Sequence, residues 1–377
     1  MTPRVVVLRG TAASSWELRP WERLHESGGA EVAVVVAPDN QYDTATVALP
    51  KVAVPTVGAR MPPGPLGRLL LKGVGQRHVG LAKALAGADV VHAAELGYWF
   101  SWQAARLKPR LGYKLVLTVW ETLPFVDAYR NVRTRRYRRE VLAATDLFLA
   151  VTERARDALL LEGAPVERIR VCPPGVDTER FAGARRPAAG DGERDRTLLS
   201  VGRLVWEKGH QDLLRAVALL RERGHDGLRA AIVGVGPEEV RLRAVAADLR
   251  LADVVDFRGG IPHDEVPAAF AEASALVLAS IPTPFWEEQF GMVLAEAMAA
   301  HLPVVAAASG AIPEVLAGYG TVFQPGDWRG LADAIAAGPL SQPPGVRTAP
   351  DAALLERYSA GAAARRLRDA YAEALGR

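Results

Sequence analysis

The sequence predicts an α/β protein made of two doubly wound domains, each with a parallel β-sheet. The chain has 377 residues, and a domain typically holds about 100–200 residues. Short apolar runs alternate with longer helix-period segments in both halves of the chain. Between the halves, residues 182–196 are rich in Gly, Ala, Arg and Asp without a hydrophobic period, which predicts a linker.

Five apolar runs predict the strands of the first domain. Because they are continuous Val/Leu runs rather than alternating ones, they suit a parallel sheet covered on both faces. These strands are expected at residues 4–8, 31–36, 89–92, 114–119 and 147–151. Helices are expected between them at residues 16–28, 65–85 and 133–145.

The same alternation restarts after the linker. Strands are expected at residues 197–201, 229–233, 254–257, 275–278, 303–306 and 320–323. Helices are expected at residues 209–223, 238–249, 263–273, 290–300 and 328–337. A last helix-period segment at 352–375 is expected to pack against the first domain. The predicted domains are therefore 1–180, completed by a helix from about 355 to 377, and 197–350, facing one another across a ligand cleft.

Composition and charge exclude several classes of protein. Charged residues make up 24% of the chain, which argues against disorder, and a formal net charge of +3 is too small to indicate a nucleic-acid partner. The single cysteine, Cys172, forbids an intrachain disulfide and favours a cytoplasmic location. The first residues carry too short an apolar run for a signal peptide or a spanning helix.

A basic run lies before and within the helix expected at 133–145. A solvated helix face explains it most simply, and an anionic acceptor or a peripheral membrane contact is the alternative. Its members are Arg130, Arg133, Arg135, Arg136, Arg138 and Arg139.

The loop at residues 202–209 combines glycine and two cations between a predicted strand and a helix. Gly202 permits close backbone approach, and Arg203 and Lys208 are spaced to clamp a diphosphate at a helix start. Lys208 is the last lysine of the chain, so lysine chemistry in the second domain has one candidate. A solvated loop is the structural alternative.

Glu288 and Glu296 flank the start of the helix expected at 290–300. A helix beginning near Phe290 would separate them by ~12 Å at 1.5 Å per residue. That is too far for two carboxylates that act on one bond, which lie about 5–9.5 Å apart, but it suits two ends of an extended ligand. The amides of Phe290, Gly291 and Met292 are then free to bind a phosphate. Ordinary helix-start and helix-surface acids are the alternative.

Other nucleotide and metal motifs are weak or missing. Gly234 and Gly236 follow a predicted strand, which suggests a nucleotide pocket, but Glu239 stands where a dinucleotide fingerprint needs a third glycine. No Walker A sequence and no Asp-x-Asp occurs, and the histidines lack metal-ligand spacing. We therefore expect no metal requirement and no tightly bound cofactor.

In the first domain, the candidate residues follow predicted strands. Arg9 and Gly10 form the first βα turn, where Arg9 could bind an anion, and Trp120 and Glu121 follow the fourth strand, where the carboxylate could orient a hydroxyl. Plain turn or core positions are the alternatives. The segment 98–100, Tyr-Trp-Phe, is either core or a platform for a sugar.

The ordered segments VCPPGVD, SVGRLVWEKGH, IVGVGP, FRGGIPHDEV and E-x7-E together resemble the retaining glycosyltransferases of family 4, which have the GT-B fold. The resemblance implies that Arg203 and Lys208 hold the donor diphosphate, that Glu288 contacts the donor sugar and that Glu296 binds the ribose. It implies close approach of the amides from Phe290 to Val293, and it adds Gly10, Gly202, Gly234, Gly236 and Arg258 to the donor site. The chain departs from the family at Trp120-Glu121, where a His-Asp pair is usual, and in its reduced glycine loop after the first strand.

The sequence therefore predicts transfer of a sugar from a nucleoside diphosphate, UDP or GDP most simply, to a hydroxyl of a small molecule, lipid or glycan. Catalytic roles fall to Glu288, Arg203 and Lys208, and acceptor contacts to Arg9, Trp120 and Glu121. A glycosyl phosphorylase that holds pyridoxal phosphate on Lys208, a non-catalytic two-lobed binding protein and a nicotinamide enzyme are the rivals.

Overall fold

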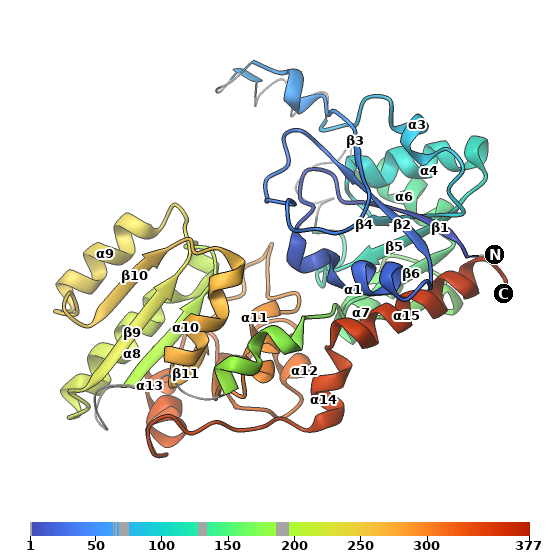
Figure 1. Ribbon diagram of the computed structural model, residues 1–377. Helices are drawn as coiled ribbons and strands as arrows, with labels where there is room; N and C mark the ends of the chain where they lie inside the picture. The colour runs from blue at the N-terminus through green and yellow to red at the C-terminus, as the bar shows by residue number, and fades with distance from the viewer. Residues whose placement is uncertain (1, 63, 65, 68–74, 127–133, 186–195) are drawn as a thin grey trace. The chain divides into compact units, whose positions relative to one another are not determined.

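The structure, a computed structural model, describes residues 2–62, 64, 66–67, 75–126, 134–185 and 196–377 (Figure 1). These residues divide into two compact units. Unit 1 runs to Val176 and resumes at Arg357, and unit 2 covers Asp177–Glu356. In the described part of the chain, no helix is long and apolar enough to cross a membrane.

Unit 1 is built on a seven-stranded parallel sheet with the order β3-β2-β1-β4-β5-β6-β7. All five predicted strands are confirmed, but β3 and β7 were missed because three-residue edge strands leave too little pattern to recognise. The strands are β1 (Arg4–Leu8), β2 (Glu31–Val36), β3 (Lys51–Ala53), β4 (Val90–Ala94), β5 (Lys114–Val119), β6 (Leu147–Ala150) and β7 (Ile169–Val171).

The helices of unit 1 include three that were predicted, α1, α6 and α15, and two, α4 and α7, that were not. They are α1 (Ser15–Glu26), α3 (Leu81–Leu85), α4 (Trp99–Leu111), α6 (Thr134–Ala144), α7 (Glu153–Leu161) and α15 (Ala360–Ala374), with 3-10 turns at Gly58–Arg60 and Val166–Arg168.

The continuous helix predicted at 65–85 is wrong. Residues 77–79 instead run antiparallel to residues 55–57: the Val57 amide donates to the Arg77 carbonyl and the Val79 amide to the Pro55 carbonyl, each at 2.8 Å. These bonds satisfy the backbone outside a helix. Residues 65 and 68–74 of that prediction lie outside the described residues.

The segment at 352–375 is two helices rather than one, and only the second packs against unit 1 as predicted, because residues up to Glu356 belong to unit 2. α14 (Ala352–Arg357) ends before Ser359, which bridges to Val176 and caps α15 by accepting from the Ala362 amide at 3.0 Å. α15 then lies alongside α1 with Ala363, Leu367 and Tyr371 buried (Figure 1).

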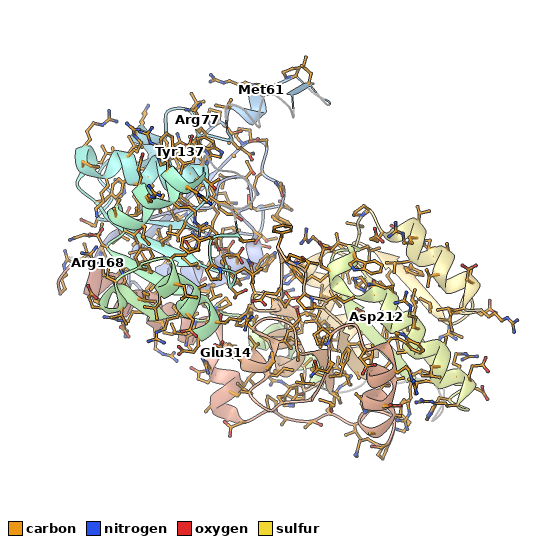
Figure 2. All side chains as sticks on the ribbon, turned by 180° about the vertical axis from the view of Figure 1, so that it is seen from behind. Met61, Arg77, Tyr137, Arg168, Asp212 and Glu314 are labelled. Atoms are coloured by element: carbon orange, nitrogen blue, oxygen red, sulfur yellow. The ribbon has the colours of Figure 1, made fainter. Side chains whose placement is uncertain are left out.

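Unit 2 is built on a six-stranded parallel sheet with the order β10-β9-β8-β11-β12-β13, and all six predicted strands are confirmed. The strands are β8 (Arg196–Val201), β9 (Leu228–Val233), β10 (Val255–Gly259), β11 (Ala275–Leu278), β12 (Val304–Ala307) and β13 (Thr321–Phe323). The helices are α8 (His210–Glu222), α9 (Glu239–Asp248), α10 (Val266–Glu272), α11 (Met292–Ala299), α12 (Ile312–Leu316) and α13 (Trp328–Ala337), followed by α14. In the first turn of α8, Asp212 is buried against Arg215 at 2.6 Å (Figure 2).

The start of the predicted linker belongs to unit 2. Residues 182–185 continue a 3-10 helix, Thr178–Arg185, which packs on α10 through Phe181 and Phe270 with ring centroids 5.4 Å apart. The linker prediction is therefore wrong for these four residues and for Arg196, which begins β8, and residues 186–195 lie outside the described chain.

Both sheets reverse their strand order at one place, between β1 and β4 in unit 1 and between β8 and β11 in unit 2. Ligands of doubly wound sheets bind beyond the carboxyl ends of the strands at this switch point. The loops after β1 and β4, and after β8 and β11, are therefore where a site is expected.

Candidate functional site

Three glycines bring the loops after β8 and β9 into close contact. The Gly202 amide donates to the Val233 carbonyl at 2.9 Å. A Cβ on Gly234 would lie 1.8 Å from the Gly202 carbonyl oxygen, and one on Gly236 would lie 2.3 Å from that of Leu204. Only glycine fits at the latter two positions, which fixes the course of the loop that carries Arg203 and Lys208.

Lys208 and Glu288 form a buried ion pair between the loops after β8 and β11. The Lys208 Nζ lies 3.0 and 2.7 Å from the two Glu288 carboxylate oxygens, and the side chains are 16% and 8% exposed. The Ser280 hydroxyl donates to the same carboxylate at 2.7 Å, and Lys208 lies 5.1 Å from the Trp286 ring centroid. The structure thus joins two of the three predicted catalytic residues.

The backbone of Glu288 is held by the loop after β12. Its carbonyl accepts from the Ala311 amide at 2.8 Å, and a Cβ on Gly310, whose φ is +55°, would lie 2.1 Å from the same oxygen. Glu288 therefore has little freedom to move away from Lys208.

α11 begins at Met292, two residues later than predicted, because Gly291 adopts a left-handed φ of +75°. Phe290 is buried, and the amides of Met292 and Val293 open the helix, where an intrahelical acceptor is missing. Glu296 then lies about one turn inside the helix, ~6 Å from its start, rather than two turns.

Glu296 belongs to a relay that the sequence did not predict. Its Oε1 lies 3.1 Å from His263 Nε2, while Arg180 donates from Nη1 to His263 Nδ1 at 2.7 Å and from Nη2 to the His263 carbonyl at 2.6 Å. Because the guanidinium can only donate, Nδ1 is the acceptor and Nε2–H donates to Glu296. Arg180 therefore orients the imidazole that holds the buried carboxylate.

Arg203 differs from Lys208 in being exposed, and no hydrogen bond or ion pair of its side chain to another described residue is found. Its backbone, however, is fixed. The buried His210 donates from Nε2 to the Arg203 carbonyl at 3.2 Å and accepts from the Ser200 hydroxyl at 3.0 Å. Burial lowers the pKa of His210 to about 4, against the opposing effect of the Arg203 hydrogen bond. His210 therefore holds the backbone of this loop, while the exposed Arg203 guanidinium is accessible to an anion.

Arg258, predicted in the donor site, lies at the end of β10 between two acids. Its guanidinium binds Asp256 at 2.8 Å and Glu272 at 2.7 Å. Because both carboxylates bind the Arg258 guanidinium, the nucleotide-sugar donor could contact Arg258 only alongside them.

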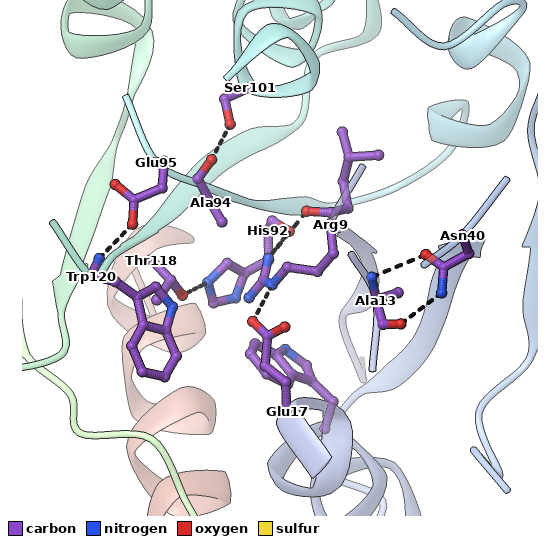
Figure 3. Close-up of polar contacts among 12 residues, drawn as sticks. Arg9, Ala13, Glu17, Asn40, His92, Ala94, Glu95, Ser101, Thr118 and Trp120 are labelled. Carbon is purple, nitrogen blue, oxygen red and sulfur yellow. Dashed lines mark hydrogen bonds and ion pairs between the residues drawn. The ribbon is translucent and has the colours of Figure 1, made fainter. Parts of the chain in front are cut away.

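In unit 1, Arg9 is buried rather than displayed at the surface. Its Nε binds Glu17 at 2.7 Å, its Nη1 donates to the Leu8 and His92 carbonyls at 3.1 Å each, and it lies 4.8 Å from the Trp21 ring centroid (Figure 3). Arg9 therefore connects the first βα turn to β4.

His92 joins this region to α15. The Trp21 indole donates to the Tyr371 hydroxyl at 2.8 Å, so that hydroxyl donates its own proton to His92 Nδ1 at 2.6 Å. His92 Nε2 then donates to Thr118 at 2.7 Å (Figure 3). Burial lowers the pKa of His92 well below its usual value, and the Arg9 charge adds to this effect. The C-terminal helix is thus fixed by a polar network as well as by its apolar face.

Gly10 and the aromatic segment after β4 meet in the same loop cluster. Gly10 has a φ of +62°, and a Cβ there would lie 2.7 Å from the Phe100 ring. Phe100 is part of the core, whereas Tyr98 is 49% exposed, so the core alternative holds for Phe100 and the sugar platform stays a prediction for Tyr98.

Trp120 and Glu121 are engaged in shaping their own loop. The Trp120 amide donates to Glu95 at 2.7 Å (Figure 3). Glu121 Oε1 accepts from the amides of Thr122 and Leu123 at 3.0 and 2.9 Å. Glu95 itself has a left-handed φ of 60°. In this arrangement Glu121 stabilises a turn, and its predicted acceptor contact has no support from the geometry.

The basic run does not form a single exposed face. Arg138 is buried in an ion pair with Glu162, Arg136 pairs with Glu140 at 2.9 Å, and Arg135 and Arg139 are exposed. Arg130 and Arg133 lie outside the described residues. Within the described ranges, no group of three His, Cys, Asp or Glu side chains is placed to hold a metal ion.

Sequence reasoning missed His263, Arg180 and His210. His263 and His210 each follow a predicted site segment by a few residues, but one histidine on a loop has no spacing partner that would single it out. Arg180 is 83 residues from His263, so only the fold brings them together.

The family models and the curated relatives that this chain resembles are all glycosyltransferases. Residues 184–338 match the family described as glycosyl transferases group 1, and residues 22–180 match glycosyltransferase family 4. The chain is 36% identical over 187 residues to the GDP-mannose-dependent alpha-(1-6)-phosphatidylinositol monomannoside mannosyltransferase of Mycobacterium tuberculosis, covering 47% of this chain and 48% of that protein. It is 35% identical over 254 residues to the D-inositol 3-phosphate glycosyltransferase of Acidothermus cellulolyticus, covering 59% and 53%. The chain thus spans about half the length of the curated relatives it matches.

Solved structures share the whole fold. The Anabaena protein HepE in complex with UDP and glucose superposes with a TM-score of 0.75 at 18% identity, covering 98% of this chain and 100% of that one. Sucrose-phosphate synthase from Thermosynechococcus elongatus gives a TM-score of 0.65 at 19% identity, covering 99% and 96%. The architecture is therefore that of the GT-B fold.

Proposed function

Because the chain belongs to glycosyltransferase family 4, we propose that it transfers a sugar from a nucleoside-diphosphate sugar to a hydroxyl acceptor with retention at the anomeric carbon. The observation that carries the proposal is the convergence of Lys208, Glu288 and the start of α11 at the switch point of unit 2. Arg203 and Glu296 complete this set on the same two loops and helix.

The donor occupies unit 2 in this proposal, and its two ends meet different groups. The diphosphate binds Arg203, Lys208 and the amides that open α11, because all three carry positive charge or free N–H groups. The ribose hydroxyls bind Glu296, which His263 and Arg180 hold in one orientation. Glu288 contacts the sugar through a carboxylate oxygen that it also shares with Lys208.

The reaction requires that the negative charge of the departing diphosphate be stabilised. Negative charge grows on the leaving phosphate, where Arg203 and Lys208 stabilise it without a reorganisation step. The diphosphate charge is thus met by side chains and amides, so transfer is expected to continue in the presence of EDTA. The acceptor hydroxyl attacks from the face that the diphosphate leaves, with the phosphate oxygen taking its proton.

The acceptor is handled by unit 1 in this proposal. Relatives of this chain are named for D-inositol 3-phosphate, for 2-deoxystreptamine and for a phosphatidylinositol monomannoside. We therefore propose a small molecule, lipid or glycan that presents a ring hydroxyl. For a lipid acceptor, the exposed Arg135 and Arg139 supply a peripheral membrane contact on the cytoplasmic side.

The test is incubation of the purified chain with UDP-, GDP-, ADP- and dTDP-sugars, with release of the nucleoside diphosphate as readout. Release from at least one donor is expected, and proton NMR of the product should show the anomeric configuration of the donor. Absence of release from every donor in the presence of candidate acceptors would overturn the proposal, and an inverted product would overturn the retaining mechanism. An absorbance band of a lysine–pyridoxal Schiff base would favour the phosphorylase instead.

A further inference from the structure

The half-buried ring of Trp286 lies beside the Lys208 ammonium, and the proposed function gives this ring no role. Its centroid is 5.1 Å from Lys208 Nζ, within the ~6 Å over which an aromatic face attracts a cation. The Lys208 side chain is only 16% exposed, so water weakens this attraction less than it would at the surface. The indole is therefore a second partner of the ammonium, beside the Glu288 carboxylate.

The two partners of the ammonium differ in what they leave for a ligand. Lys208 Nζ donates to both Glu288 carboxylate oxygens, at 3.0 and 2.7 Å, and the carboxylate balances the lysine charge. The Trp286 ring attracts the ammonium but carries no charge that could cancel it. An ammonium has three N–H donors, and among the described residues two of those of Lys208 have an acceptor. The ring thus holds Lys208 while leaving its charge and one donor for an anion.

The donor needs both members of the ion pair at once. In the proposed function, Glu288 contacts the sugar and Lys208 the diphosphate, so a sugar hydroxyl competes with the ammonium for the same carboxylate oxygens. An ammonium on a flexible four-carbon stem that loses this partner gains many orientations. Fixing it again on a phosphate would cost side-chain entropy, unless another partner keeps it in place.

The backbone of Trp286 is held close to the lysine loop. The Thr283 amide donates to the Trp286 carbonyl at 2.7 Å, which closes a tight turn. Just before this turn, the Ile281 amide donates to the Glu207 carbonyl at 2.8 Å. Because Glu207 directly precedes Lys208 in the chain, these two bonds tie the segment that carries the ring to the loop that carries the ammonium.

The stem of Lys208 is confined as well. A Cβ placed on Gly202 would lie 3.7 Å from both Lys208 Cγ and Cδ, so the stem runs along the backbone of that glycine. The end of the side chain is then the part whose orientation Glu288 and Trp286 decide.

We propose that Trp286 is a positioning residue, which keeps the Lys208 ammonium in place for the donor diphosphate while Glu288 contacts the sugar. The ring acts through Lys208 and need not touch the nucleotide. This inference rests on the proposed function for the identity of the ligand, but what it predicts is binding of a nucleoside diphosphate rather than sugar transfer.

The test is isothermal titration calorimetry with UDP, GDP, ADP and dTDP, followed by titration of each variant with the diphosphate that binds the wild type most tightly. Trp286→Leu removes the aromatic face and should raise the Kd about three- to tenfold. Trp286→Phe keeps an aromatic face and should recover most of the affinity. Trp328→Leu makes the same change at the start of α13, outside the donor site, and should leave the Kd unchanged.

A double-mutant cycle separates positioning from packing. Lys208→Met should weaken the diphosphate on its own, and adding Trp286→Leu should weaken it no further, because the ring then has no cation to hold. An equal loss from Trp286→Leu in the presence and in the absence of the lysine would show that the ring acts only in packing and would overturn the inference.

The outcomes distinguish this inference from the proposed function. A loss of diphosphate affinity that depends on Lys208 and that phenylalanine rescues supports the positioning role, even if no sugar transfer is found. Wild-type affinity in Trp286→Leu would overturn the role and leave the proposed function intact, whereas failure of every diphosphate to bind the wild type would overturn both. If Trp286→Leu does not fold, as judged by circular dichroism, Trp286→Met makes the same comparison with a longer side chain that has no aromatic face.

Discussion

The switch points of the two sheets differ in the charge of the residues beside them. The switch point of unit 2 carries several ionisable side chains. Lys208 pairs with Glu288, Glu296 pairs with His263, and Arg203 is exposed. At the switch point of unit 1, the Glu17 carboxylate balances the charge of Arg9, and His78 Nε2 and Arg9 Nη2 have no hydrogen-bond partner among the described residues.

In the proposed function, unit 2 binds the donor and unit 1 the acceptor, and the difference in charge fits this division. A diphosphate needs fixed positive charge, and pairing the lysine with a glutamate keeps that charge in place before the ligand arrives. A neutral acceptor hydroxyl needs no such charge. The same fold would then serve two substrates through the residues after the same two strands.

The largest effect should come from Lys208→Met. Removing a group that stabilises the leaving charge costs about 10²–10³-fold in turnover. The buried Glu288 is also left unpaired, which should lower the free energy of unfolding by about 3–5 kcal/mol. Urea unfolding and a nucleotide-release assay measure the two effects.

A double variant separates stability from catalysis. Lys208→Met with Glu288→Gln removes both charges, so the free energy of unfolding should recover while activity stays lost. If the double variant regained activity, the lysine would be structural and the charge-based account of unit 2 would be wrong.

The second prediction concerns pH and the loop that carries Arg203. The folded pKa of His210 is about 4 and the unfolded value about 6.5, so the unfolded state binds the proton more readily. Stability from this group is present above pH 6.5 and is lost as pH falls toward 4, by about 3 kcal/mol in all. Urea unfolding of the wild type and of His210→Gln should show a shallower decline in the variant. Identical slopes would contradict the buried, neutral state of His210.

The third prediction tests the ribose carboxylate. Glu296→Ala should raise the KM for the donor about 10–100-fold, since a hydrogen bond to a charged group contributes about 1.5–3 kcal/mol. The KM for the acceptor should not change, because that substrate is assigned to unit 1. Glu222→Ala, at the exposed end of α8, is the matched control. An effect on the acceptor alone would reverse the assignment of the two units.

The smallest effect is expected from the relay behind Glu296. His263→Ala leaves the carboxylate in place but unoriented, so the donor KM should rise about three- to tenfold with little change in kcat. His263→Gln restores an N–H donor at a similar reach and should recover most of the affinity. A loss that glutamine does not rescue would mean that His263 acts only in packing.

The sequence was more informative about unit 2 than about unit 1. The site residues of unit 2 lie on short strand–loop–helix segments, at 202–209 and at 288–296. The sequence spacing within each segment therefore predicts which side chains follow a strand and meet at the switch point. The start of α11 was misplaced by two residues because the left-handed Gly291 delays the helix.

In unit 1 the important contacts join residues that are far apart in the sequence. His78 was placed within a predicted helix, but it lies on an extended segment because residues 77–79 pair with residues 55–57. His92 and Tyr371 are 279 residues apart, and nothing local indicates that they bind one another. Arg9 was singled out as an anion ligand, but Glu17 on the next helix turns it into a neutral pair.

Amide hydrogen exchange with the nucleotide tests the central claim most directly, because it reports which segments the nucleotide protects. UDP or GDP should slow exchange in peptides that cover residues 202–209 and 288–296 of unit 2 and leave the peptides of unit 1 unchanged. Protection of unit 1 by the nucleotide, with none at 202–209 or 288–296, would contradict the account.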